Sequence, residues 1–164
     1  MKKYLRPVLL TLLAALLLMQ FYRPARNQSN DQTYHVSTKY PMPAEVEAIL
    51  KPACYDCHSN YTNYPWYANV QPVASWLAGH VKEGTKHLNF SEWTKRKVAV
   101  QNHKFEEIIE SQETKWMPLD SYTWTHYDAK LTDQQRETIK AWAKANMDSL
   151  SVWYPADSLV LKRK

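Results

Sequence analysis

The chain has 164 residues, which is enough for one small domain with one modest core. Its formal net charge of +5 comes from residues 1–26, which hold five basic residues and no acidic one, whereas residues 27–164 carry 16 of each sign. Without the basic end Lys162-Arg163-Lys164 the body of the chain is mildly acidic, so the charge pattern excludes a nucleic-acid-binding protein.

The first segment combines a basic start with an apolar run. Three basic residues lie among the first six, and the apolar run extends from Val8 to Met19. This order is typical of a secretion signal, and with its aromatic flanks the run approaches the ~20 residues of a membrane span. Residues 17–23 are bulky and only Ala25 offers a cleavage position. The pattern therefore favours an uncleaved signal anchor, a transmembrane segment over residues 1–23, with cleavage as the alternative.

The rest of the chain divides into a linker, a domain and a tail. Residues 24–42 are polar and show no apolar period, which indicates a tether. Residues 43–150 contain the apolar periods of helices and form the predicted domain, and residues 151–164 form a tail. The chain has two glycines against nine prolines, a balance that favours short helices interrupted by proline, so we expect an all-α fold.

Four helices are expected in this domain from their caps and breakers. The first is expected to begin at Pro43 and end at Pro52, and the second to begin at Pro72 and end at Gly84. The third is expected to be capped at its start by Ser91, and the fourth by Thr132, with Gln135 completing a capping box.

The only two cysteines lie in Cys54-Tyr55-Asp56-Cys57-His58, a C-x-x-C-H motif. This spacing is the signature of c-type haem attachment, in which two thiols add to the vinyl groups and the imidazole ligates the iron. A zinc site requires four ligands, a redox dithiol requires a βαβ setting, and a disulfide across so short a loop is strained. We predict one covalent haem c on Cys54 and Cys57 with His58 as the proximal iron ligand, and zinc or a redox dithiol as the alternatives.

The succession of motifs resembles class I cytochromes c and, more specifically, the haem-binding domain family found in many Bacteroidetes envelope proteins. The resemblance covers about residues 34–150 and is carried by C-Y-D-C-H-S-N at 54–60, Y-P-W-Y at 64–67, P-V-A-S-W-L at 72–77, L-N-F-S-E-W at 88–93, and Met117-Pro118. It implies a membrane-tethered, monohaem, cytochrome c-like helical domain, and it implies no defined redox partner.

The sixth iron ligand is predicted to be Met117, which matches the family's Met-Pro pair. A thioether is a soft ligand that raises the reduction potential, although Met117 as a gap-filling core residue is the alternative. His80, on the apolar face of the second helix, is the alternative distal ligand. The residues expected to line the haem pocket are Tyr61, Tyr64, Trp66 and Trp76.

Three functions are compatible with such a haem. Outer-sphere electron transfer with a transient redox protein is favoured, because a six-coordinate iron needs no substrate pocket. A gas or redox sensing module and a peroxidase-like enzyme with an open sixth position are the alternatives, and the sequence contains no distal histidine and acid pair for the latter. Because c-type cytochromes are matured outside the bacterial cytoplasm, we expect a cell-envelope protein, held in the membrane by its anchor, with the haem domain in the periplasm.

Overall fold

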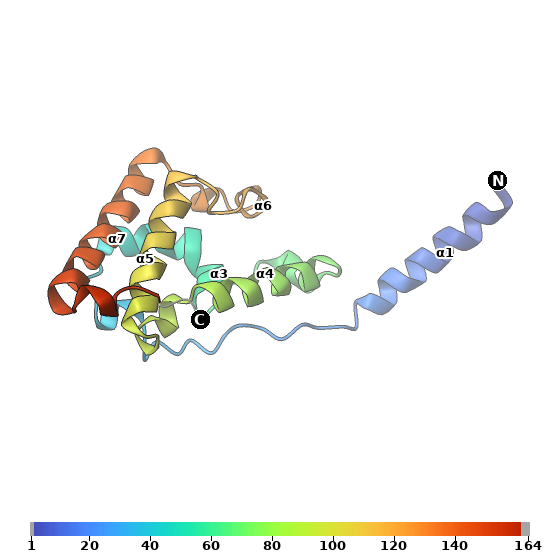
Figure 1. The fold of residues 1–164 in the computed structure, drawn as a ribbon. Coiled ribbons are helices and arrows are strands. Elements are labelled where there is room, and N and C mark those ends of the chain that lie inside the picture. The colour runs from blue at the N-terminus through green and yellow to red at the C-terminus, as the bar shows by residue number, and fades with distance from the viewer. Residues whose placement is uncertain (1, 162–164) are drawn as a thin grey trace.

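The computed structural model describes residues 2–161, so Met1 and the last three residues of the predicted tail lie outside the described residues. Over this range the fold is helical, which agrees with the all-α prediction, and an isolated β-bridge joins Gln28 and Tyr61. The α-helices in Figure 1 are α1 (Lys2–Met19), α2 (Ala44–Leu50), α3 (Asp56–His58), α4 (Val73–His87), α5 (Val98–Glu113), α6 (Asp120–Thr123) and α7 (Asp133–Trp153).

The core lies between α5 and α7, which pack along each other, with α2 against α7. Phe105 of α5 is fully buried at its centre. Its ring lies 5.1 Å from that of Tyr40, 4.6 Å from that of Trp93 and 5.5 Å from that of Trp142. The indole N–H of Trp142 donates to the carbonyl of Pro41 at 2.8 Å, so this buried polar group is paired.

The start of α7 confirms the predicted capping box. The hydroxyl of Thr132 accepts a hydrogen bond from the backbone N–H of Gln135 at 3.2 Å, and the Gln135 side chain accepts one from the Thr132 N–H at 2.9 Å. Two of the four unpaired donors at a helix start are satisfied in this way. The apolar residues predicted to face inward from this helix are buried, namely Ile139, Trp142, Ala143 and Leu150.

Three predicted helix boundaries are wrong. The helix before the cysteines does not end at Pro52, because a π-helical turn over Lys51–Tyr55 continues it into α3. Pro52 has no N–H to donate to the preceding turn, and the wider π-helical turn allows the helix to continue without that hydrogen bond. The next helix continues past Gly84 to His87. Ser91 does not cap α5: it lies in a 3₁₀ helix, Phe90–Lys95, where Asn89 provides the cap.

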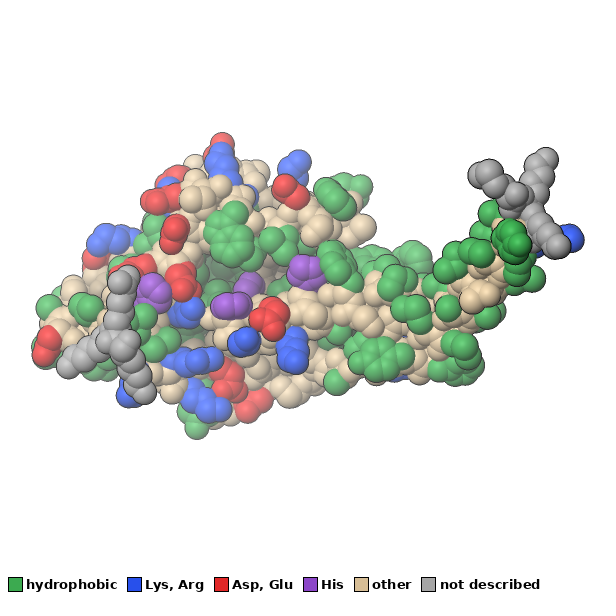
Figure 2. All heavy atoms as spheres, turned by 45° about the vertical axis from the view of Figure 1, so that its right-hand side comes forward, with side chains coloured by type: hydrophobic (Ala, Val, Ile, Leu, Met, Phe, Trp, Pro, Cys, Tyr) green, Lys and Arg blue, Asp and Glu red, His purple; other side chains and the backbone are tan. Residues whose placement is uncertain are grey.

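α1 projects away from the body of the molecule, and Figure 2 shows hydrophobic side chains along it. Within residues 2–161, no helix combines the length and the apolar character needed to cross a membrane. The predicted transmembrane segment is therefore without support from the structure.

The residues expected to form a tether lie along the domain. We call residues 20–34 the strap; Figure 1 shows it running as an extended chain from the end of α1 beneath α4. The side-chain amide of Asn27 donates to the carbonyl of Ser59 at 2.8 Å, and the backbone N–H of Thr62 donates to the carbonyl of Asn27 at 2.9 Å. Further along, the N–H of Thr94 donates to the carbonyl of Tyr34 at 3.0 Å. The strap thus pairs backbone groups of one loop and of the 3₁₀ helix Phe90–Lys95.

Candidate functional site

The C-x-x-C-H motif occupies one continuous helical stretch. Cys54 lies in the π-helical turn Lys51–Tyr55, and Cys57 and His58 lie in α3, which follows this turn directly. Both cysteines are free thiols and both are partly buried. The two sulfurs and the imidazole therefore belong to neighbouring positions of one short, helical segment, as the motif predicts.

The environment of the two thiols keeps them protonated. Burial raises the pKa of Cys54 to about 12, the neighbouring Cys57 adds to this increase, and the positive charge of Arg136 opposes it. Burial, followed by the charge of Asp56, raises the pKa of Cys57 to about 11. A reactive dithiol requires a lowered thiol pKa, so this environment argues against the redox-dithiol alternative.

The zinc alternative also finds little in the structure. Among residues 2–161, His, Cys, Asp and Glu side chains form no cluster of three or more that is suited to a metal ion. The described part of the chain thus offers zinc no ready set of ligands.

His58 is oriented by two backbone carbonyls. Its Nδ1 lies 3.0 Å from the carbonyl oxygen of Gly84 and 3.1 Å from that of Leu88. Because a carbonyl only accepts hydrogen bonds, Nδ1 must carry the proton, which leaves the lone pair of Nε2 available to a metal. Burial lowers the pKa of His58, against the effect of these two hydrogen bonds, so the imidazole is neutral, the form that ligates iron.

Gly84 allows α4 to approach the motif closely. A Cβ atom added at this position would lie 2.4 Å from the carbonyl oxygen of Cys57 and 3.1 Å from its Cβ. Only glycine leaves room for this contact between two backbones. Gly84 therefore serves this close contact and does not end the helix as predicted. The same contact places the Gly84 carbonyl within hydrogen-bond distance of His58.

Met117 lies in the segment between α5 and α6, where it is partly buried beside the buried Pro118. We call residues 114–130 the distal loop. The carbonyl of Met117 accepts a hydrogen bond from Nη1 of Arg136 at 2.7 Å, which ties the start of this loop to α7. The Tyr122 hydroxyl lies 2.9 Å from Oδ2 of Asp56 and 3.0 Å from the carbonyl of Pro52. The distal loop is thus tied to the motif itself, and the role of the Met117 sulfur stays a prediction.

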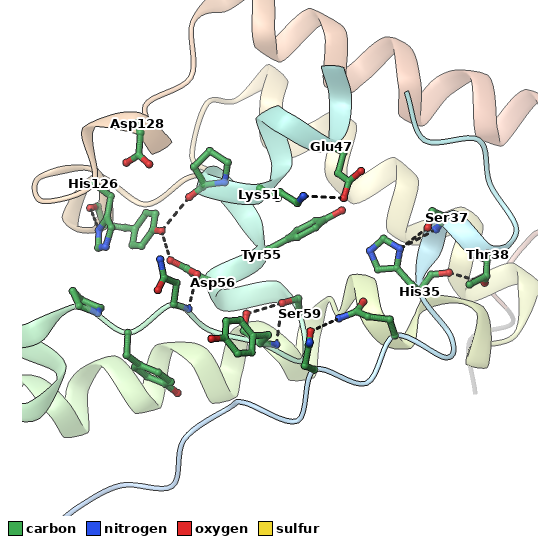
Figure 3. Close-up of a pocket in the computed structure, with 18 residues that line it drawn as sticks. His35, Ser37, Thr38, Glu47, Lys51, Tyr55, Asp56, Ser59, His126 and Asp128 are labelled. Carbon is green, nitrogen blue, oxygen red and sulfur yellow. Dashed lines mark hydrogen bonds and ion pairs between the residues drawn. The ribbon is translucent and has the colours of Figure 1, made fainter. Parts of the chain in front are cut away.

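A cleft of about 1070 Å³ lies over the two residues between the cysteines. Figure 3 shows Tyr55 in its middle, with His35, Ser37 and Thr38 on one side and His126 and Asp128 of the distal loop on the other. Of the predicted pocket residues, Tyr61 and Tyr64 line this cleft, whereas the cysteines and His58 do not. Three carboxylates line the cleft, those of Glu47, Asp56 and Asp128, and Lys51 pairs with Glu47 at 3.3 Å. The structure thus brings these two tyrosines together with Tyr55.

Of the remaining predicted residues, the two tryptophans are exposed and His80 is partly buried. The side chain of Trp66 is 78% exposed and that of Trp76 is 52% exposed. Trp76 and His80 share α4, where their rings meet edge to face at a centroid distance of 4.4 Å. Histidine side chains, shown in purple, gather across the middle of the face in Figure 2. The roles of Trp66, Trp76 and His80 toward a haem stay predictions.

Sequence reasoning missed the residues that support the motif. The acceptors for His58 are main-chain carbonyls, which leave no mark in a sequence, and Tyr122 is one of 11 tyrosines. Gly84 did carry a signal, because a glycine within an apolar helical period also indicates a close backbone approach.

The donor set fits a covalently bound porphyrin. Two protonated thiols on one turn provide the sulfur atoms for thioether bonds, and His58 presents an unengaged Nε2 with its other nitrogen held.

Comparison with known proteins supports haem binding. A family model described as "Haem-binding domain" matches residues 14–145, most of the chain. No curated protein and no solved structure matches the chain.

Proposed function

The chain belongs to the haem-binding domain family, and we propose that it holds a single haem covalently through Cys54 and Cys57 and serves in electron transfer. The observation that carries the proposal is the arrangement of residues 54–58: two thiols and one imidazole in a single helical stretch, with His58 Nδ1 bound to the carbonyls of Gly84 and Leu88. When bound, the haem supplies a one-electron couple at its iron.

His58 is the proximal ligand in this proposal. The two carbonyls hold the ring and keep the proton on Nδ1, and they increase the basicity of the nitrogen that binds iron. Met117 is the distal ligand, delivered by a loop that Arg136 and Tyr122 tie down. A thioether ligand in addition to the imidazole would favour the reduced state and raise the potential. With His58 and Met117 both holding the iron, the domain would need only an exposed cofactor edge and a transient redox protein.

The buried thiols also bear on how the cofactor is attached. In the folded domain both cysteines have raised pKa values, so each thiol is a weak nucleophile at neutral pH. The burial of both thiols favours attachment before the domain has closed around residues 54–58. This order is the one expected for a protein exported unfolded and matured outside the cytoplasm.

The proposed location is the bacterial cell envelope, with the domain on the periplasmic side. Support comes from the first helix, in which a basic start precedes the apolar run Val8–Met19, the length of a signal h-region. The same helix is proposed to retain the chain at the membrane. Fractionation of cells expressing the full chain tests this proposal; recovery of the haem protein from the cytoplasm would refute it.

The attachment is tested on the full chain made with a working maturation system. We expect a coloured protein whose pigment resists extraction with acidified acetone, and loss of that resistance when both Cys54 and Cys57 are replaced by serine. A pigment that is extracted from the native chain would refute covalent binding.

The ligand set is tested by spectroscopy. The oxidised protein should show the weak far-red band of a sulfur-to-iron bond, and Met117→Ala should remove the band and lower the potential. The control His80→Ala should keep the band. Rapid binding of carbon monoxide to the reduced native protein would instead indicate an open position, which is what a sensing or peroxidase-like function requires.

A further inference from the structure

Arg136 makes two hydrogen bonds through the same nitrogen. Its Nη1 donates to the carbonyl of Met117 at 2.7 Å and to Oε1 of Gln112 at 2.7 Å. Gln112 lies on α5 and is only 4% exposed, and its amide donates to the hydroxyl of Ser111 at 3.0 Å. Arg136 on α7 is thus held by a buried side chain on α5, and it binds the distal loop from that fixed position.

We propose that Arg136 is the positioning residue of the sixth ligand: by holding the Met117 carbonyl it sets where the Met117 thioether lies and keeps it on the iron. This inference rests on the proposed function, in which Met117 is that ligand. The bond acts on the same residue that carries the sulfur. Because it is made by a charged donor, it is stronger and shorter than a neutral hydrogen bond.

The charge of Arg136 acts on the haem-binding motif as well as on the distal loop. The pKa of Cys54 is raised by burial first and then by Cys57, and the Arg136 charge counters these effects, so the guanidinium lies within electrostatic range of that thiol.

The other ties of the distal loop act elsewhere. The ion pair between Lys115 and Asp133, 2.6 Å long, joins two exposed side chains and is weakened by solvent and salt. Tyr122 holds the middle of the loop against Asp56. The hydrogen bond from Arg136 is the one that acts directly on Met117.

The experiment compares Arg136→Gln and Arg136→Lys with the native full chain, with haem attached in each. The control is Lys140→Gln, which removes one positive charge from the same helix, where Lys140 pairs with Glu137 at the surface. Two properties are measured on the oxidised protein: the far-red sulfur-to-iron band, and the affinity for added imidazole, which competes for the sixth position. Haem content is measured in parallel.

In Arg136→Gln we expect a weakened band and an imidazole affinity increased by about tenfold or more, the loss expected for a charge-assisted hydrogen bond. Arg136→Lys should lie between this variant and the native protein, because a lysine cannot reproduce the planar donor fork of arginine. Lys140→Gln should match the native protein. If Arg136→Gln fails to accumulate, Gln112→Met removes the acceptor that orients Arg136, and it should increase imidazole affinity by about threefold.

Each other outcome overturns the inference in its own way. If the Arg136 and Gln112 variants keep the native band and the native imidazole affinity, the distal loop positions Met117 without the hydrogen bond from Arg136. A changed reduction potential with an intact band and unchanged imidazole binding would give Arg136 an electrostatic role instead. Absence of the band from the native protein would refute the Met117 ligand itself, a failure of the proposed function that the variants are not needed to detect.

Discussion

Replacing Gly84 by alanine tests the contact between α4 and the haem-binding motif. The new methyl group would lie 2.4 Å from the carbonyl oxygen of Cys57, below the 3.0 Å that real Cβ contacts essentially always exceed. The group that it meets is backbone, which cannot rotate away as a side chain does. Either α4 or α3 must move, and the carbonyl that orients His58 moves with α4.

Two effects with opposite signs decide how far Gly84→Ala changes the free energy of unfolding. Alanine is favoured over glycine inside a helix by about 1 kcal/mol. Overpacking at a closed contact is unfavourable by about 1–3 kcal/mol, with the upper end expected against rigid backbone. Gly79, five residues earlier on α4, has nothing within 4 Å of its added Cβ and provides the matched control. We expect Gly79→Ala to stabilise the protein by about 0.5–1 kcal/mol and Gly84→Ala to destabilise it by about 1–2 kcal/mol.

The assay is urea denaturation of the two variants and the native chain, followed by circular dichroism, together with the fraction of each that carries haem. Gly84→Ala should lower the unfolding midpoint and the haem content, and Gly79→Ala should raise the midpoint and leave haem content unchanged. If both substitutions stabilise the protein equally, the close approach of α4 to Cys57 does not exist and the orientation of His58 by Gly84 fails with it.

Three further substitutions probe the supports of the site. Tyr122→Phe removes the hydrogen bonds that tie the distal loop to the motif and should lower the free energy of unfolding by about 1–2 kcal/mol, whereas Tyr127→Phe, on a side chain that is 80% exposed, should leave it unchanged in the same urea titration. Asn27→Ala removes two side-chain hydrogen bonds of the strap and should speed proteolysis within residues 20–34; native resistance would show that the strap is not held there. Burial lowers the pKa of His35, and the charge of Glu47 opposes this effect. The unfolded chain therefore binds a proton at His35 more readily than the folded one. The folded state has its full stability with respect to this group above pH 6.5 and loses stability as the pH falls through the folded-state pKa of His35. This part of the pH dependence of the unfolding midpoint should disappear in His35→Ala, and an unchanged profile would contradict it.

The helices that the sequence predicts well are those specified by neighbouring residues. Thr132 and Gln135 cap α7 through contacts three residues apart, and the apolar residues of this helix repeat with its period. The donor set of the site is local in the same sense, because five consecutive residues contain both thiols and the imidazole. Such features depend on short spacings, which a single sequence displays directly.

The packing of the strap against the domain cannot be predicted from such short spacings. Asn27 binds Ser59 and Thr62 through amide, carbonyl and hydroxyl groups that pair without any apolar period. A polar extended segment that folds against a loop therefore has the same sequence pattern as one that remains in solvent. The residues that distinguish the two cases lie more than thirty positions away, in a loop whose own carbonyls need donors.

Gly84 shows how such a long-range requirement still leaves a local trace. A glycine after an apolar helical period has two interpretations, a helix end or a close contact with another backbone. A helix end is supported when proline follows within a few residues or when the apolar period stops. After Gly84 no proline follows until Pro118, and Leu88 packs against the core. These two features favour the contact, and the partner that makes glycine necessary is Cys57, within the motif that the sequence already marks as the site.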